Sequence, residues 1–322
     1  MFNNMNSLGL NIIFKMGCLC SREVVHINNC KYKVLDRLGE GGFSNVDLVQ
    51  NEHTKKKYAL KRVKCHSKED EKIAMKEIEI HRKIHHINVI ELLDSDIKGQ
   101  ADIVINAVSE VYMLLPYYRR GTLQHHLDLK GIRKDHWNEH ELLTMFLGIC
   151  EGVRAFHEAT PEPLAHRDLK TANICLEDDM TPVIMDLGSA TEARVKICGV
   201  QDAQKLQELA SERCSMPYKA PELFNVESYC MVDERTDIWS LGCILYAMCF
   251  FKSPFDIIYE RGDSVALAVI SGNITFPEEG PYDGAIHDLI AFMLKLNPME
   301  RPYIYSVIEK TVDLLAQYEN KV

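Results

Sequence analysis

Apolar and polar positions divide the chain into a β-rich first third and a helical remainder. From residue 32 onward, apolar residues alternate with polar ones in short runs, which is the period of half-buried strands. Between the last two apolar runs lies a polar, glycine-containing stretch that we expect to be a turn with a modest insertion. The pattern predicts strands over residues 32–38, 47–50, 57–63, 89–93 and 111–115.

One helix is predicted within this β-rich part, over residues 67–85. Its first turn is acidic, which suits a helix N-terminus. Glu77 falls on the apolar side of the helix and would need a cation there, for which Lys61 is the candidate. The alternative is a surface glutamate paired with His81 or Lys76. The predicted cap and the other residues of the inward side are Ser67, Ile73, Ile80 and Ile84.

After residue 122 the apolar positions recur at helical spacing. The pattern therefore predicts that segment 116–121 is a linker between a small lobe (about 32–115) and a larger helical lobe (122–315). The predicted fold class is α+β. Further helices are predicted over residues 139–158, 203–213 and 238–251, with two amphipathic helices on either side of Arg301-Pro302. The run 238–251 has the length of a buried core helix and is too short to cross a membrane.

Composition places the chain among globular proteins. It has 322 residues, of which 46% are hydrophobic, enough to bury a core. The net charge of −10 argues against general nucleic-acid binding, which needs a basic face. Its 11 cysteines are odd in number and scattered, as expected for reduced thiols. Residues 1–15 lack the charged start and cleavage site of a secretory signal.

The N-terminal segment, residues 1–31, contains a possible acylation motif at residues 16–21. Met16-Gly17 with a serine five residues after the methionine fits the myristoylation pattern, provided that translation starts at Met16. Cys18 and Cys20 are then candidates for palmitoylation, because one myristoyl chain alone gives only marginal membrane binding. On the motif alone, a chance match is an equal alternative.

The most informative stretch is His166-Arg167-Asp168-Leu169-Lys170-Thr171-Ala172-Asn173. A phosphoryl-transfer site needs a carboxylate to accept a hydroxyl proton, a cation to neutralise a phosphate, and a ligand for a metal ion. Asp168, Lys170 and Asn173 could supply these groups from one loop. Asp186 ends a later apolar strand, where a carboxylate suits Mg²⁺. A surface loop with a salt bridge is the alternative.

Two further motifs are weak when taken singly. A glycine-rich turn spans residues 39–46, with Ser44 at the position of the third glycine of a phosphate-binding loop. No Gly-Lys-Ser/Thr follows, which argues against a P-loop NTPase. Ala59 and Lys61 share one face of the next strand, where a flat ring and a phosphate could lie. Each motif is also compatible with an ordinary turn or a solvated lysine.

The order of these motifs, ending in Ala220-Pro221-Glu222, resembles the eukaryotic protein kinase family over residues 32–315. The resemblance implies a bilobal protein kinase fold, with a small antiparallel β-rich lobe containing one helix and a larger, mainly α-helical lobe. It also implies ATP and Mg²⁺ as cofactors. Asp168 would be the catalytic base and Lys170 the γ-phosphate cation, Asn173 and Asp186 would hold Mg²⁺, and Lys61 with Glu77 would hold the other phosphates.

The resemblance also assigns an ATP site. Leu115 would be the gatekeeper, Cys175 the floor of the adenine pocket, and the backbone of Pro116 and Tyr118 would bind the adenine edge. Lys170 favours a serine/threonine kinase. The remaining ATP-binding positions would be Leu38, Gly39, Glu40, Gly41, Gly42, Phe43, Ser44, Asn45, Val46 and Ala59. Structural roles would fall to Ser215, Asp237, and the pair Glu222 and Arg301.

Three residues depart from the family pattern without removing a charge or a metal ligand. Ser44 replaces a glycine, Leu187 replaces the Phe of Asp-Phe-Gly, and Thr171 replaces a common Pro. The intact charges favour an active enzyme over the alternative, a pseudokinase-type membrane scaffold.

Within the family the chain resembles the Numb-associated kinases, and most closely a member that is myristoylated and palmitoylated. The matching segments are residues 39–46, 185–189, 203–213 and 233–237. This implies a helix inserted in the activation segment. It also implies acylation at Gly17, Cys18 and Cys20, a peripheral place on the cytoplasmic side of Golgi or secretory-pathway membranes, and a protein substrate phosphorylated on Ser or Thr.

Overall fold

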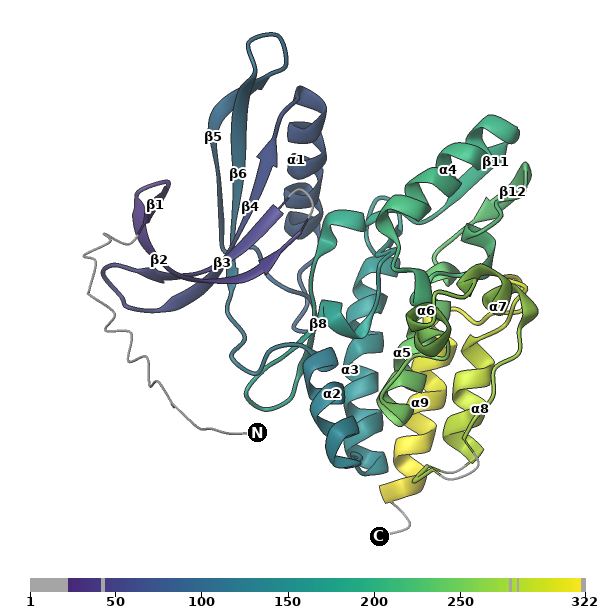
Figure 1. The fold of residues 1–322 in the computed structure, drawn as a ribbon. Coiled ribbons are helices and arrows are strands. Elements are labelled where there is room, and N and C mark those ends of the chain that lie inside the picture. The colour runs from purple at the N-terminus through teal and green to yellow at the C-terminus, as the bar shows by residue number, and fades with distance from the viewer. Residues whose placement is uncertain (1–22, 42–43, 278–279, 283, 320–322) are drawn as a thin grey trace, which may run out of the picture.

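The computed structural model describes residues 23–41, 44–277, 280–282 and 284–319. The small lobe is one antiparallel sheet in the order β1-β2-β3-β4-β6-β5, flanked by helix α1 (Figure 1). β1 lies in the segment that we placed ahead of the domain, yet it pairs with β2 over its whole length. The strands are β1 (Val24–Ile27), β2 (Cys30–Glu40), β3 (Ser44–Asn51), β4 (Lys57–Cys65), β5 (Asp94–Asp102) and β6 (Ala107–Pro116).

The prediction of a strand over residues 89–93 is wrong, and the strand is β5 instead. The apolar run packs between the lobes, where the Ile90 N–H donates to the Ile184 carbonyl at 2.9 Å. β5 follows it as an exposed edge strand paired with β6. An edge strand that is exposed to solvent needs no apolar face. The sequence of β5 therefore lacks the alternation of apolar and polar residues by which a strand is predicted.

Helix α1 (Lys68–Lys83) confirms the predicted helix and its cap. Ser67 and Asp70 form a reciprocal capping box at its start. Its inward side differs in part from the prediction, because Ile73 is exposed while Ile78 is buried. Ile80, Ile84 and Glu77 are buried as expected.

The larger lobe is built around α5 (Arg235–Phe250), which is buried on nearly all sides. A buried helix is apolar around its circumference, so it shows no amphipathic stripe. Among the described residues, no helix is long and apolar enough to span a membrane. The other helices of this lobe are α2 (Leu123–Arg133), α3 (Glu139–His157), α6 (Asp256–Glu260), α7 (Val265–Ser271), α8 (Gly284–Met293) and α9 (Ile304–Glu319).

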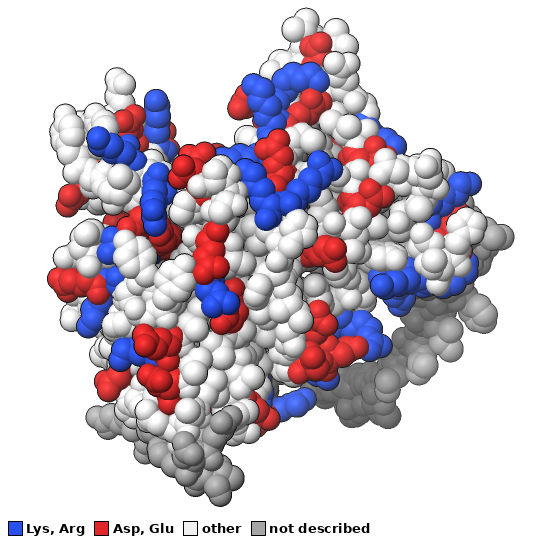
Figure 2. Space-filling view, turned by 180° about the vertical axis from the view of Figure 1, so that it is seen from behind, with Lys and Arg blue, Asp and Glu red and all other residues white. Residues whose placement is uncertain are grey.

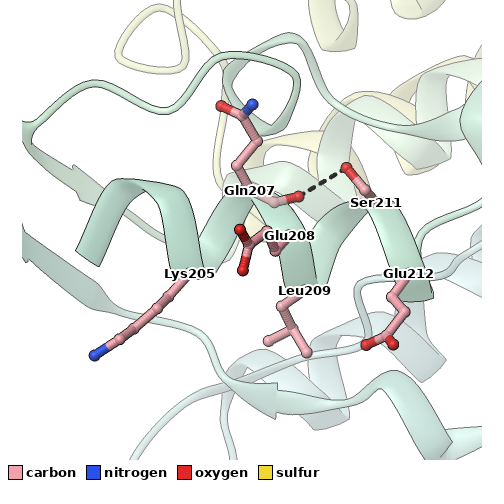
Figure 3. Close-up of a pocket in the computed structure, with 6 residues that line it drawn as sticks. All are labelled: Lys205, Gln207, Glu208, Leu209, Ser211 and Glu212. Atoms are coloured by element: carbon pink, nitrogen blue, oxygen red, sulfur yellow. Dashed lines mark hydrogen bonds between the residues drawn. The ribbon is translucent and has the colours of Figure 1, made fainter. Parts of the chain in front are cut away.

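The segment between Asp186 and Glu222, which corresponds to the predicted activation segment, contains the predicted helix, α4 (Val200–Arg213). Figure 1 shows α4 on the outer side of the large lobe, away from β1. Its exposed side carries an open hollow lined by residues of α4 alone, and none of them is a predicted catalytic residue (Figure 3). Short strands complete the lobe: β7 (Leu164–Ala165), β8 (Ile174–Leu176), β9 (Pro182–Ile184), β10 (Thr191–Glu192), β11 (Val195–Cys198) and β12 (Tyr229–Val232).

The chain passes from the small lobe to the large lobe through the segment between β6 and α2. The structure thus has a β-rich first part and a helical second part, which confirms the α+β class. On the face seen in Figure 2, basic and acidic side chains are interspersed over most of the described surface.

Candidate active site

Lys61 connects the two lobes through a pair of carboxylates. Its ammonium lies 2.7 Å from Glu77 Oε1 and 2.8 Å from Asp186 Oδ1. Burial alone would lower the pKa of Lys61, but the charges of Glu77 and Asp186 raise it above its ordinary value. Burial would raise the pKa of each carboxyl group, and the Lys61 charge holds both pKa values below their ordinary range. All three groups are therefore charged at neutral pH.

The local folding explains this arrangement. β4 places Lys61 opposite Val46 of β3 and Met113 of β6, on the middle of the sheet. Gly188 lies two residues after Asp186, and a Cβ atom at Gly188 would lie 3.3 Å from Glu77 Oε2. Glycine therefore permits the close approach of this turn to α1. His81, the alternative partner considered for Glu77, lies farther away, with 3.9 Å between His81 Nε2 and Glu77 Oε1.

Asp168 and Lys170 form a second charged group in the loop of residues 166–173, here named the catalytic loop. Lys170 Nζ donates to Asp168 Oδ2 at 2.9 Å and contacts Ser215 Oγ at 2.6 Å. The Ser215 N–H donates to Asp168 Oδ1 at 2.8 Å. The predicted contact of Ser215 with both residues is therefore present. These bonds hold one carboxylate and one cation side by side, as the transfer of a proton and a phosphoryl group requires.

Asn173 is fixed by the same aspartate. Its amide nitrogen donates to the Asp168 carbonyl at 2.9 Å and to Asp168 Oδ2 at 3.0 Å. These bonds use the amide donors and leave the amide oxygen for a hard cation. The Asp186 side chain is 48% exposed, so it too can reach a ligand. The described residues hold no cluster of three or more His, Cys, Asp or Glu that could bind a metal alone.

That donor set fits Mg²⁺. This ion is commonly bound by one or two protein side chains together with substrate phosphates, and it keeps several waters. Asn173 and Asp186 would hold it, and when bound it would neutralise phosphate charge during transfer.

Hydrogen bonds to Asp237 hold the backbone of the catalytic loop in place. Its carboxylate accepts the backbone N–H groups of His166 and Arg167 at 2.8 and 3.0 Å, and lies 3.1 Å from His157 Nε2. Arg167 has a positive φ of 66°, a strained conformation that these bonds maintain. Asp237 is fully buried, and its predicted anchoring role fits this position.

The glycine-rich turn is described only in part. The Gly41 N–H donates to the Ser44 carbonyl at 2.7 Å, which closes the turn between β2 and β3. Pairing places Gly39 opposite Val46 and Glu40 opposite Asn45, with an exposed Leu38 preceding them. Gly42 and Phe43 lie outside the described residues, as do the acylation positions Gly17, Cys18 and Cys20.

The predicted adenine pocket is bordered by a cluster of apolar side chains. Buried Leu115 and half-buried Ala59 and Tyr118 belong to it, and Ala59 pairs opposite Leu115. Cys175 Sγ lies 3.3 Å from Met185 Sδ, and burial raises its pKa to about 12, so the thiol stays protonated. Pro116 ends β6, and the Tyr118 carbonyl accepts the Gly121 N–H at 3.2 Å.

Sequence reasoning missed several members of this cluster. They are the apolar residues Ile90, Leu92, Val183 and Met185. The apolar strand that leads into Asp186 was a usable signal for the last two. The first two were assigned to a strand, which concealed their packing between the lobes.

The structure accounts for Thr171, one of the three departures from the family pattern. Its hydroxyl donates to Gln124 Oε1 and lies 3.0 Å from the Tyr218 hydroxyl. Thr171 is 1% exposed, so these bonds are made in the protein interior. It thus joins α2 and the catalytic loop to the end of the activation segment.

Leu187, a second departure from the family pattern, and the predicted pair of Glu222 and Arg301 also have clear positions. Leu187 is fully buried and belongs to the main apolar core. Arg301 forms a two-pronged ion pair with Glu222, with both distances 2.8 Å. The Arg301 side chain has no exposure, and its other N–H groups donate to backbone carbonyls, among them that of Arg235 at 2.8 Å.

Comparison with known proteins agrees with this geometry. The family described as "Protein kinase domain" matches residues 32–312. Serine/threonine-protein kinase 16 of Rattus norvegicus and of Homo sapiens are each 42% identical over 287 residues, covering 89% of this chain and 91% of theirs. Serine/threonine-protein kinase ppk13 of Schizosaccharomyces pombe is 31% identical over 327 residues, covering 92% of this chain and 94% of its own. The chain therefore belongs to the protein kinase family.

Proposed function

We propose that this chain is an active serine/threonine protein kinase that uses ATP and Mg²⁺. The observation that carries the proposal is the continuous set of charged contacts from Glu77 through Lys61 to Asp186, beside Asp168 and Lys170. The names of the similar kinases support Ser and Thr as the acceptors.

The proposed roles follow from the contacts of each side chain. Asp168 accepts the proton of the substrate hydroxyl, and Lys170, held beside it, stabilises charge on the transferred group. Lys61 orients the remaining phosphates while Glu77 keeps its ammonium in place. Catalysis then comes mainly from positioning and electrostatic stabilisation.

Transfer of labelled phosphate from Mg-ATP to a protein substrate tests this proposal. Asp168→Ala should lower transfer by about 10²–10⁴-fold, the usual contribution of a general base. Asp178→Ala, at an exposed carboxylate paired with Arg119, is the matched control and should keep full activity. Phosphoamino-acid analysis should find phosphoserine or phosphothreonine. Equal transfer by wild type and Asp168→Ala would instead favour the alternative, a pseudokinase scaffold.

We also propose that acyl groups hold the enzyme on Golgi or secretory-pathway membranes, facing the cytoplasm. The support is the sequence Met16-Gly17-Cys18-Leu19-Cys20-Ser21 and the resemblance to an acylated kinase. When translation starts at Met16, Gly17→Ala should move the protein from membranes to the soluble fraction. Unchanged membrane association would contradict the anchor.

A further inference from the structure

The small lobe carries a group of lysines at one end of its sheet. Lys31 and Lys33 lie on β2, while Lys55, Lys56 and Lys57 lie in the turn after β3 and at the start of β4. These five residues are here named the lysine cluster.

Sheet pairing brings the two halves of the cluster together. Gln50 pairs opposite both Lys33 and Lys57, so these lysines share one face of the sheet. The Glu52 N–H donates to the Lys31 carbonyl at 3.0 Å, which places the turn beside β2. Strand pairing therefore brings lysines from two separate sequence segments to the same end of the sheet.

The cluster is not neutralised by neighbouring acids. None of its members forms an ion pair with another described residue, whereas nearby Arg62 pairs with Glu23 and Asp47. Lys33 is half-buried and the other four lysines are exposed. Carboxylates near the cluster include Glu52 in the turn and Glu91, which lines a cleft with Lys56 and Lys57. Five lysines without an ion-pair partner among the described residues, on a chain of net charge −10, form a basic region that an anionic partner would complement.

The position of the cluster indicates which partner it meets. Val24 pairs opposite Lys33, and the Glu23 carbonyl accepts the Val34 N–H at 2.9 Å, so the cluster adjoins the start of the described chain. Cys20 precedes Glu23 by three residues, a span of about 10 Å when extended. That span is about one Debye length at physiological salt, so acyl groups in a bilayer would hold the cluster within reach of its surface charge.

We propose that the lysine cluster is a membrane-contact surface that binds anionic lipid headgroups and orients the small lobe on the bilayer. The inference rests on the proposed acyl anchor and adds to it an electrostatic contact that supplements the acyl chains. A lysine near an anionic leaflet strengthens binding by about fivefold. Figure 1 shows β1 at the outer edge of the small lobe, far from α4, so an orientation with this edge on the bilayer leaves the activation segment open to protein substrates.

Sedimentation of the N-myristoylated chain, started at Met16, with lipid vesicles tests the proposal. One set of vesicles contains phosphatidylcholine alone, and the other contains added phosphatidylserine. The variant Lys31→Gln/Lys55→Gln/Lys57→Gln should lose about 100-fold of its binding to the anionic vesicles and none to the neutral ones. The matched control removes three exposed lysines of the large lobe outside the activation segment, Lys134→Gln/Lys295→Gln/Lys310→Gln, and should bind as wild type.

The outcomes separate this inference from the anchor itself. Equal binding of both triple variants to anionic vesicles would overturn the lysine cluster as a lipid-binding surface. Equal binding of the myristoylated and unmyristoylated chains would overturn the anchor instead, whatever the lysines do. Both triple variants should phosphorylate a soluble substrate at the wild-type rate, which shows that they are folded.

Discussion

Thr171 gives the most specific prediction, because its hydroxyl links three parts of the large lobe. Thr171→Val keeps the shape of the side chain and removes the hydroxyl that meets the Tyr218 hydroxyl at 3.0 Å. Tyr218 is 7% exposed, so its hydroxyl would be left buried without this partner. Loss of one partner from a buried hydrogen bond costs about 1–3 kcal/mol. For a domain of this size, that corresponds to a fall in Tm of roughly 2–10 °C.

The assay is urea unfolding of wild type, Thr171→Val, Tyr218→Phe and the double variant. The double variant no longer contains the Tyr218 hydroxyl that Thr171→Val leaves buried without its partner, so it should be more stable than the sum of the single effects by about 0.5–3 kcal/mol. A Thr171→Val free energy of unfolding within about 0.5 kcal/mol of wild type would refute the reasoning. Strict additivity of the two single effects would refute the link between these hydroxyls.

Three further predictions concern the charged groups. The pKa values of Glu77 and Asp186 are lowered, so their stabilising effect is present above the ordinary carboxyl pKa of about 4 and is lost as pH falls through the lower folded-state values. Between neutral and acid pH, the free energy of unfolding of wild type should therefore fall more steeply than that of Glu77→Gln. Urea unfolding that gives the same pH dependence for both proteins would contradict this. Glu222→Ala leaves the buried Arg301 unpaired and should cost about 3–5 kcal/mol in urea unfolding, and a loss below about 1 kcal/mol would be too small. Arg167 already donates to the Ala193 carbonyl and the Thr236 hydroxyl, so it needs no phosphate group on the activation segment as a partner. Protein shown by mass spectrometry to be unphosphorylated should therefore be active, and inactivity would refute this.

The sequence predicted those elements whose apolar period was strong. Helix α3, with Asn138 as its cap, agrees closely with the predicted range, and α4 begins only three residues earlier than expected. Residues 89–93 misled the prediction because they are apolar for a different reason. They pack between the lobes, and apolar content alone does not distinguish this from a buried strand.

The charged site could be anticipated because each charge requires a partner. Glu77 on an apolar helix face called for a cation, and the structure supplies Lys61 at 2.7 Å. The Thr171 contacts could not be foreseen, because Gln124 and Tyr218 each lie 47 positions away in the sequence. The lysine cluster was missed for the same reason, since β-strand pairing alone brings its two halves together.

The central claim is that this site transfers a phosphoryl group rather than only binding a nucleotide. Its most direct test measures ATP binding and phosphate transfer on the same preparations of wild type and Asp168→Asn. The account predicts that both proteins bind Mg-ATP with similar affinity, while the variant transfers phosphate about 10²–10⁴-fold more slowly. Wild-type protein that binds Mg-ATP yet transfers no more phosphate than Asp168→Asn would contradict it.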